Sequence, residues 1–551
     1  MRKKRILFCS EATFLNTGYA TYTREILNYL HGTGKYEIAE LASYAENNDP
    51  RSNTPWKFFG VMPSQENEQL FQAYRSDMRG QFGGFAFEKV CLEFLPDIVC
   101  DIRDFWMIEF AYNSPYRRMF NWAIMPTVDA APQSKEWIHS YSTADACFSY
   151  SNWSGDVLTK QSGNKINYIG TASPSAHPAY QPIENKAGLK SSLGINPETK
   201  IIGTVMRNQR RKLYPDLFKA FRMFINSVEN KNDYKLYCHT SYPDAGWDIP
   251  ELLNEHELHS YVLFTYVCPD TRKFFVSHFN GAICESPFTG NFSARLANVK
   301  SGLSYEDLAK VMNTFDLYVQ YANCEGFGLP QVEAAACGIP VMSVDYSAMT
   351  SVVRQLEGTP IPVKTLYKEM ETGCERAIPD NEAAAKLFAD FFAKPEAIRK
   401  REGFNSRQKF LSTFQWDKSG KVWEDYFDSV EPRSIEETWR SKPDIIDPAP
   451  LLDDMPKQTY SGIVDWLFDK VLCKPQEKNS YLYDSILDNL MYGFRTNPII
   501  GSFLNENDSV ISNAKKLEQE PYTLERAYGE LREMRMKINA WERKRAEVMG
   551  L

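Results

Sequence analysis

The segment from residue 325 to residue 340 contains the residues whose types and spacing most clearly suggest chemistry. It reads Glu-Gly-Phe-Gly-Leu-Pro-Gln-Val-Glu-Ala-Ala-Ala-Cys-Gly-Ile-Pro. Gly326 and Gly328 let a backbone approach a ligand closely. Pro330 suits the first position of a helix, and the Gly-Ile-Pro at 338–340 suits its end. The sequence therefore predicts a glycine loop that leads into a short helix.

Two glutamates flank the glycines of this loop. The amides of the first helical turn form an anion site, which suits a phosphate. Glu333 lies one turn into the helix, where a carboxylate is a natural acceptor for a pair of ribose hydroxyls. Glu325 precedes the glycines and is expected to face the group attached to the phosphate. The alternative is an ordinary strand–loop–helix segment with two solvated glutamates.

A second candidate site lies upstream, in the basic segment that follows an expected strand at 201–205. Arg207 and Lys212 are five residues apart there. Two such cations can hold a diphosphate from one side while the helix amides hold it from the other. The negative charge that grows on a leaving diphosphate needs this stabilisation. The alternative is a solvated basic loop.

These residues together resemble the signature of an enzyme family. Glu325 and Glu333, with seven residues between them around Gly-Phe-Gly-Leu-Pro, resemble the paired glutamates of retaining glycosyltransferases, most closely glycosyltransferase family 4 (glycosyl transferases group 1). The spacing from Arg207 to Lys212 resembles the diphosphate-binding pair of that family, with Leu213 in place of its usual glycine. The resemblance implies the GT-B fold, in which two Rossmann-like domains face a cleft.

The resemblance extends through most of the chain, over residues 5–430. Thr17-Gly18 matches the glycine loop that meets the donor across the cleft. Asp129 falls where the family often has a His or a His-Asp pair, although Asp129 can also be interpreted as a turn or cap residue before Pro132. The resemblance implies catalytic roles for Glu325, Arg207, Lys212 and Asp129, and donor binding by Thr17, Gly18, Gly326, Phe327, Gly328, Leu329 and Glu333.

The order of apolar and polar segments predicts how these residues are positioned. Short apolar runs alternate with helical periodicity in both halves of the chain, which favours an α/β class with doubly wound parallel sheets. We expect a first domain at 1–182, a linker at 183–199, a second domain at 200–413, helices at 414–430 that cross back to the first domain, and a helical extension at 431–551.

Composition excludes several classes of protein. The chain has 551 residues and 43% hydrophobic residues, so it is not mostly disordered, and a net charge of −8 disfavours broad coating of nucleic acid. No apolar run reaches the length of about 18 residues that a membrane-spanning helix needs. The eleven cysteines are scattered, which suggests reduced thiols and a cytoplasmic protein. Cys268 and Cys284 each lack the nearby second cysteine of a zinc knuckle, so we expect no metal.

The family resemblance implies a transferase that takes a sugar from a nucleotide-diphosphate sugar, with UDP favoured over GDP, and retains the anomeric configuration without a cofactor or metal. The acceptor stays open between a glycan, a small molecule and a hydroxymethylated base in DNA. Two rival functions stay open as well, namely a nucleotide-sugar epimerase and a non-catalytic nucleotide-sugar-binding protein. An apolar stripe at 524–548 leaves a homo-oligomer through the C-terminal helix open.

Overall fold

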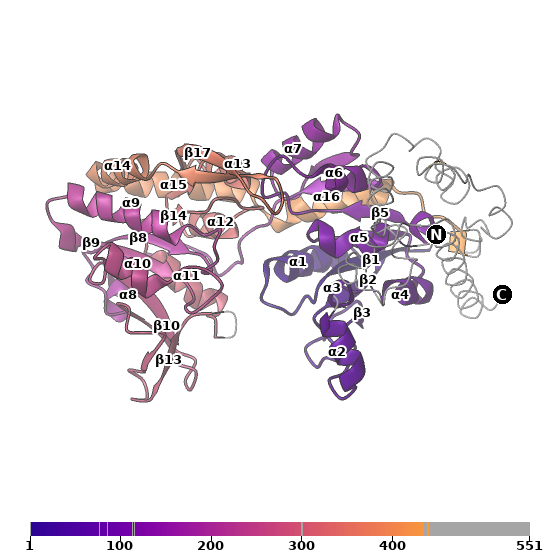
Figure 1. Cartoon of the computed structure of the whole chain (residues 1–551), viewed down its shortest axis with the longest axis horizontal. Coiled ribbons are helices and arrows are strands. Elements are labelled where there is room, and N and C mark those ends of the chain that lie inside the picture. The colour runs from indigo at the N-terminus through magenta and orange to yellow at the C-terminus, as the bar shows by residue number, and fades with distance from the viewer. Residues whose placement is uncertain are drawn as a thin grey trace, which may run out of the picture.

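Two α/β lobes lie side by side along the long axis of the molecule (Figure 1). The computed structural model describes residues 2–439 apart from 77, 85, 113, 115, 299, 300 and 435–437, together with residue 465. The expected extension at 431–551, with its apolar stripe, therefore lies almost wholly outside the described residues. Of the helices in the described part, none is long and apolar enough to cross a membrane.

The first lobe is built on a seven-stranded parallel sheet in the order β3-β2-β1-β4-β5-β6-β7. Its central strands are buried on both faces, which explains why they read as continuous apolar runs. The strands are β1 (Lys4–Glu11), β2 (Tyr36–Ser43), β3 (Lys57–Gly60), β4 (Ile98–Asp101), β5 (Asn121–Ile124), β6 (Ala146–Ser149) and β7 (Tyr168–Thr171). The helices are α1 (Gly18–Thr33), α2 (Glu68–Ser76), α3 (Met78–Gln81), α4 (Phe87–Phe94), α5 (Phe105–Tyr112), α6 (Lys135–Ser142) and α7 (Asn152–Ser162), with a 3-10 turn at Arg117–Met119.

The second lobe is built on a nine-stranded sheet in the order β12-β13-β10-β9-β8-β14-β15-β16, with β11 also paired to β10. The strands are β8 (Lys200–Val205), β9 (Tyr234–His239), β10 (Val262–Val267), β11 (Phe274–Ser277), β12 (Ile283–Glu285), β13 (Phe292–Leu296), β14 (Leu317–Gln320), β15 (Val341–Val344) and β16 (Thr359–Ile361). The helices are α9 (Tyr214–Ser227), α10 (Ile249–Glu255), α11 (Tyr305–Asn313), α12 (Leu329–Ala336), α13 (Ala348–Gln355), α14 (Asn381–Ala393) and α15 (Glu396–Thr413), with a 3-10 turn at Lys231–Asp233. A separate antiparallel hairpin joins β17 (Val363–Lys368) to β18 (Glu375–Pro379).

Antiparallel strands extend the second sheet beyond the parallel pattern that the sequence predicts. β11 and β13 both pair antiparallel with β10, and β12 pairs antiparallel with β13. Short connections suffice for antiparallel neighbours, whereas parallel neighbours need a long crossover. Gly281 and Gly290 adopt the left-handed backbone, with φ of 90° and 72°, in two of these connections.

The segment expected to be a polar linker at 183–199 contains a helix, α8 (Lys186–Ser192). Asn185 caps its start by accepting a hydrogen bond of 2.8 Å from the amide of Gly188. Lys190 is buried and donates to the carbonyl of Thr199 at 2.6 Å and to Asp316 at 3.0 Å. The segment therefore packs on the second lobe.

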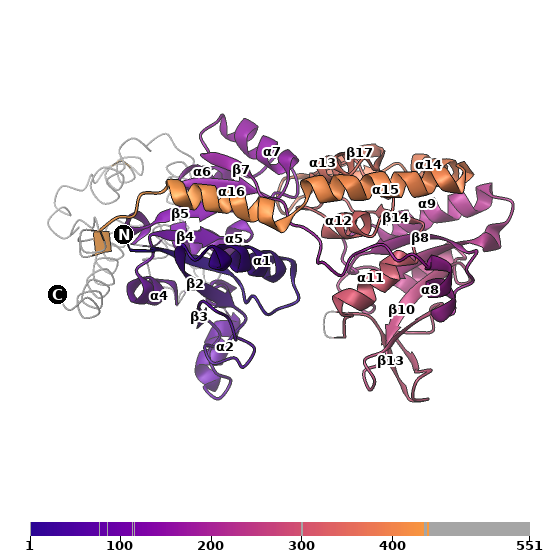
Figure 2. The same cartoon turned by 180° about the vertical axis from the view of Figure 1, so that it is seen from behind.

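The last described helix, α16 (Trp416–Ser429), returns from the second lobe and packs on the first (Figure 2). The ring of Trp423 stacks on Phe148 with centroids 3.9 Å apart, and its indole N–H donates to the Tyr22 hydroxyl at 3.0 Å. A Cβ at Gly420 would lie 2.4 Å from the ring of Tyr29, so only glycine permits this approach to α1. The first lobe therefore contains residues from both ends of the described chain.

Strand order reverses between β1 and β4 in the first sheet and between β8 and β14 in the second. Loops that follow the strands at such a reversal form a crevice, which is where open α/β sheets bind ligands. Thr17-Gly18 follows β1, Arg207 and Lys212 follow β8, and Glu325 follows β14. The topology therefore brings these five predicted residues to the reversal points of the two sheets.

Candidate active site

The glycine loop at 325–328 and the helix after it form as predicted. α12 begins at Leu329 and ends at Ala336, with Pro330 in its first turn. Gly328 precedes it with φ of 85°, a left-handed backbone that favours glycine. Gly338 lies just beyond the helix with φ of 73°. The glycine and proline signals in the sequence therefore locate both ends of this helix correctly.

Glu325 is buried directly in front of this loop. Its Oε1 accepts a hydrogen bond of 2.7 Å from the side-chain amide of Gln320, the last residue of β14. The same oxygen forms an ion pair with the ammonium of Lys212. Its backbone N–H donates to the hydroxyl of Ser347 at 2.9 Å. The structure thus joins one predicted glutamate to one predicted cation.

Pairing between two loops places Lys212 beside Glu325. β8 and β14 are parallel neighbours, so the loops that follow them run side by side. Lys212 bridges to Ala322, and the amide of Leu213 donates to the carbonyl of Tyr321 at 3.1 Å. Burial lowers the pKa of the Lys212 ammonium well below its usual range, and the neighbouring Arg211 adds to this shift.

Arg207 occupies a different position from Lys212. Its Nε and Nη2 each donate to a separate oxygen of Asp244 at 2.9 Å. The hydrogen bonds to Asp244 hold the pKa of Arg207 above its usual value. Its side chain is 49% exposed, whereas that of Lys212 is 10% exposed. The two predicted diphosphate-binding cations are therefore both paired with carboxylates of the second lobe.

A cavity of about 1000 Å³ lies between the lobes and collects predicted residues from both. Thr17 and Gly18 line it from the start of α1, and Leu329 and Glu333 line it from α12. Burial raises the pKa of Glu333 to about 7, and the neighbouring Tyr180 hydroxyl opposes that shift. Four of the predicted donor-binding residues therefore converge on one volume, whose size is typical of a small-molecule site.

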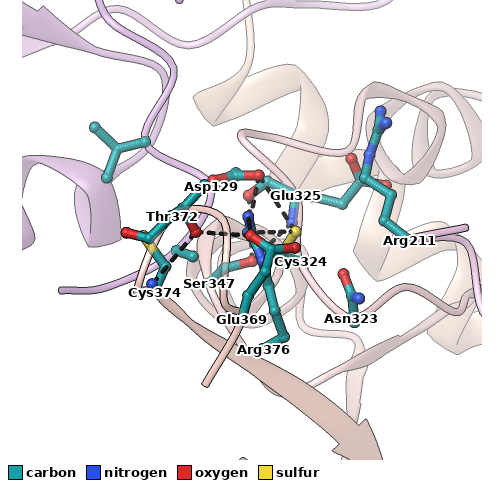
Figure 3. A network of polar contacts seen from close by, with 12 residues as sticks. Asp129, Arg211, Asn323, Cys324, Glu325, Ser347, Glu369, Thr372, Cys374 and Arg376 are labelled. Atoms are coloured by element: carbon teal, nitrogen blue, oxygen red, sulfur yellow. Dashed lines mark hydrogen bonds and ion pairs between the residues drawn. The ribbon is translucent and has the colours of Figure 1, made fainter. Parts of the chain in front are cut away.

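Asp129 lies outside that cavity, in a polar network that bridges the two lobes (Figure 3). Its carboxylate accepts a hydrogen bond of 3.0 Å from Nη1 of Arg376 on β18, and the thiol of Cys324 lies 3.3 Å from the same oxygen. Arg376 also donates to Glu369 at 2.7 Å. Asp129, for which the resemblance implies a catalytic role, is therefore held by an arginine of the second lobe, beside the cysteine that precedes Glu325.

Sequence reasoning missed both Arg376 and Asp104. Asp104 follows β4 at the reversal point of the first sheet, beside the hydroxyls of Tyr19 and Thr127, which are 2.7 Å apart. Burial raises the pKa of Asp104 to about 6, and those two hydroxyls oppose the shift. The position of Asp104 after a buried strand was a signal available in the sequence. Arg376 offered no such local signal.

The lobes meet closely where Gly326 faces Thr127. A Cβ at Gly326 would lie 2.5 Å from the Thr127 side chain, so only glycine fits at this contact. The small size of residue 326 thus serves the close approach of the two lobes, whereas the left-handed turn of the loop lies at Gly328.

A metal site would need several acidic, histidine or cysteine side chains around one point. Among residues 2–439 that the structure describes, no group of three or more His, Cys, Asp or Glu side chains is arranged to hold a metal ion. Cys268 follows β10 and Cys284 lies on β12, and both thiols are free and buried.

Comparison of the sequence with known protein families gives one match. Residues 297–389 match the family model described as glycosyl transferases group 1, and these residues include the glycine loop and both glutamates. This match shows that the segment with the glycine loop and both glutamates is similar to that family. No curated protein sequence matches the chain.

Solved structures share the fold of the whole two-lobed part. Sucrose-phosphate synthase from Thermosynechococcus elongatus is 16% identical, with a TM-score of 0.57 over 78% of this chain and 100% of that chain. HepE from Anabaena, solved with UDP and glucose, is 12% identical, with a TM-score of 0.53 over 78% of this chain and 100% of that chain. A glycosyltransferase from Rickettsia africae is 12% identical, with a TM-score of 0.53 over 80% of this chain and 100% of that chain. The protein therefore has the two-domain GT-B fold, as the sequence predicts.

Proposed function

We propose that this protein transfers a sugar from a nucleoside-diphosphate sugar to an acceptor hydroxyl with retention of anomeric configuration. The observation that carries the proposal is the cavity between the lobes, where Thr17 and Gly18 face Leu329 and Glu333. The ion pair of Lys212 with Glu325 lies at the start of the same glycine loop. Uridine diphosphate is the first nucleotide to test, because HepE of the same fold is solved with it.

The two glutamates, the two cations and the glycine-loop amides each have a proposed role in this reaction, whereas Asp129 is given none. Glu333 accepts hydrogen bonds from the ribose hydroxyls, and Glu325 accepts them from the hydroxyls of the donor sugar. Arg207, Lys212 and the amides of residues 326–329 stabilise the leaving diphosphate. The bond from the anomeric carbon to the phosphate oxygen breaks as the acceptor oxygen attacks from the same face. The acceptor proton passes to the leaving phosphate oxygen, so no separate base is needed.

The ion pair between Lys212 and Glu325 has a consequence for donor binding. Without a donor, each charge neutralises the other in a buried setting, where an unpaired charge is costly. A diphosphate that reaches Lys212 frees the Glu325 carboxylate to accept from the sugar. Donor entry therefore divides one ion pair into two separate interactions with the ligand.

The proposal includes metal-independent turnover in the cytoplasm. The proposed diphosphate site contains cations and backbone amides, and transfer is expected to persist in chelator. The described cysteines are free thiols, in keeping with a reducing compartment. We propose a glycan or a small hydroxylated molecule as the acceptor.

Steady-state kinetics together with calorimetric binding of UDP test these roles. Arg207→Ala and Lys212→Ala are expected to lower turnover more than donor affinity, because the charge they stabilise grows in the transition state. Glu333→Ala is expected to weaken UDP binding by about ten- to hundredfold, since a hydrogen bond to a charged group is worth about 1.5–3 kcal/mol. Glu325→Ala is expected to depress turnover.

Glu382→Ala provides a matched control for these glutamates, because Glu382 is exposed in the first turn of α14. It should leave UDP binding and turnover unchanged. If Glu333→Ala binds UDP as tightly as the parent protein, the ribose assignment is wrong. Normal turnover in both cation variants would show that the diphosphate site lies elsewhere.

A further inference from the structure

Two loops of the second lobe emerge together beside the proposed diphosphate site. One loop covers 206–213 after β8, and the other covers 240–248 after β9. β8 and β9 are parallel neighbours in continuous register from Lys200 opposite Tyr234 to Val205 opposite His239. The first loop carries both predicted cations, whereas the second carries none of the residues predicted for the site.

Side-chain and backbone hydrogen bonds fasten these two loops to each other. The fully buried side chain of Asn208 accepts from the amide of Trp247 and donates to its carbonyl, each at 2.8 Å. The indole N–H of Trp247 donates to the carbonyl of Lys212 at 2.8 Å. A Cβ at Gly246 would lie 2.7 Å from the backbone carbonyl carbon of Asn208, so only glycine fits between the loops. The second loop therefore holds the first one at both ends.

The ion pair of Arg207 with Asp244 is the central contact between these loops. Asp244 engages Nε and Nη2, which form one edge of the planar guanidinium, at 2.9 Å each. Asp244 is itself oriented, because it accepts from the Ser241 hydroxyl and from the amide of Ala245 at 2.8 Å. The hydrogen bonds from Arg207 lower the pKa of Asp244 to about 2, so this partner is ionised at any working pH.

The other edge of the same guanidinium differs from the edge that Asp244 holds. Among the residues that the structure describes, Nη1 of Arg207 has no hydrogen-bond partner. A guanidinium offers five N–H donors in a fixed plane, so a carboxylate on one edge and a phosphate on another can bind together. An exposed arginine without such a partner would sample many rotamers, and the ion pair removes that freedom before a ligand arrives.

We propose that Asp244 is a positioning residue that aims the free edge of Arg207 at the donor diphosphate, with the loop at 240–248 as its rigid support. This inference rests on the proposed function, because it assigns Asp244 a part in the same reaction. Asp244 touches no substrate. It acts through Arg207, whose free edge stabilises the departing phosphate as the glycosidic bond breaks.

The competing interpretation is that Asp244 only neutralises Arg207 and is displaced by the donor. The two interpretations predict effects of opposite sign. If Asp244 competes with phosphate, its removal strengthens binding of UDP and of inorganic pyrophosphate. If Asp244 positions Arg207, its removal lowers turnover and gives no gain in binding.

A double-mutant cycle on the full chain decides between them. The variants are Asp244→Ala, Asp244→Asn, Arg207→Ala and the double variant Asp244→Ala with Arg207→Ala. Asp244→Ala is expected to lower kcat by about ten- to hundredfold, the size of loss that a misplacement of about 1 Å causes. UDP binding should change little. The double variant is expected to turn over no more slowly than Arg207→Ala alone, because Asp244 acts only through Arg207.

Two measurements keep a folding defect separate from this result. Asp244→Asn keeps an acceptor oxygen and nearly the same volume, so it should fold and show a smaller loss of kcat than Asp244→Ala. Glu257→Ala is the matched control, because it also removes an arginine's carboxylate partner in this lobe, that of Arg222. It should leave kcat unchanged, and thermal unfolding of all variants reports whether the lobe is intact.

Three results would overturn the assignment. They are tighter binding of UDP or pyrophosphate to Asp244→Ala, an unchanged kcat in folded Asp244→Ala, and a fold-loss of kcat in the double variant equal to the product of the losses in the two single variants. Each of these appears only when variants are compared with an active parent. Failure of the proposed function appears in the parent itself, as no transfer from any nucleoside-diphosphate sugar tested. The two failures are therefore distinguishable in one set of experiments.

Discussion

Glu333 combines a charge-dependent role with a buried position. It lies on α12 at the wall of the interlobe cavity, and its pKa is raised to about 7 chiefly by burial. Only the ionised carboxylate offers all its lone pairs to the two ribose hydroxyls, since the protonated form keeps one oxygen as a donor. The proposed donor site therefore contains a group that titrates near neutral pH.

Donor affinity is expected to depend on pH through this carboxyl group. The carboxylate is the competent form, so UDP should bind more weakly as the pH falls below about 7, by up to about tenfold per pH unit. Above that pH the affinity should level off. Calorimetry across this range measures UDP affinity as a function of pH. Glu333→Gln should bind UDP weakly at every pH, because the group that titrates is gone and the affinity no longer changes with pH through it. A parent profile that is flat between pH 6 and pH 8 (about one unit on each side) would contradict the assignment.

The same pKa shift fixes the sign of a stability effect. The folded-state pKa of Glu333 lies above its ordinary value of 4.5, so the folded state holds a proton that the unfolded state releases. Its contribution to the free energy of unfolding therefore falls as the pH rises from 4.5 to about 7. Glu333→Gln should gain stability relative to the parent protein above that range, which chemical unfolding at two pH values can measure.

At the scale of elements, the β17–β18 hairpin connects the lobes beside the glycine loop. The amide of Glu375 donates to the carbonyl of Ala131 at 2.9 Å, and Arg376 pairs with Asp129 at 3.0 Å. Arg376 also approaches the thiol of Cys324 at 2.8 Å, directly before Glu325 (Figure 3). This hairpin therefore joins the first lobe to the backbone that carries a proposed catalytic residue.

Removal of Arg376 is expected to destabilise the protein strongly. Its side chain is 8% exposed and balances Asp129 and Glu369, so Arg376→Ala leaves two carboxylates without their cation. The side chains of Asp129 and Glu369 are 33% and 27% exposed, so water partly compensates the loss of the cation, and chemical unfolding should show a loss of about 1–3 kcal/mol. Arg401→Ala on the exposed side of α15 is the control and should stay within about 0.5 kcal/mol of the parent. Equal stability of both variants would show that the network contributes little.

Helices, strands and their ends could be predicted from the sequence where residues close to them in the chain determine them. The ends of α12 follow from Gly328, Pro330 and Gly338, and its neighbouring strands follow from short apolar runs. Arg376 and Asp129 are 247 residues apart, and no local pattern encodes their pairing. The spacing of the motif was enough to predict where both glutamates lie relative to the glycine loop. The ion pair between Glu325 and Lys212 could not be predicted in this way, because it depends on which strands become neighbours in the sheet.

At the scale of the whole molecule, the first lobe is completed by a helix from the far end of the described chain. Trp423 of α16 is fully buried and contacts Phe8, Phe148 and Phe427. Tyr29 of α1 donates to Glu424 at 2.9 Å, and Lys35 pairs with the same carboxylate. The crossing from α15 to α16 therefore links the two lobes through covalent chain as well as through the hairpin contacts.

Two shortened chains test this dependence on α16. A chain that ends at residue 440 keeps α16 and the buried Trp439, which packs near Tyr116 with centroids 6.0 Å apart. It should stay soluble, bind UDP and hydrolyse the donor, while losing acceptor use or assembly. A chain that ends at residue 413 loses α16, exposes the apolar surface under Trp423 and should fail to fold. Trp423→Ala in the full chain should cost about 3–5 kcal/mol, as large-to-small changes of a buried aromatic do. If the chain that ends at residue 440 is wholly insoluble, the two lobes do not fold without the residues that follow. If the chain that ends at residue 413 binds UDP normally, α16 is not part of the core of the first lobe.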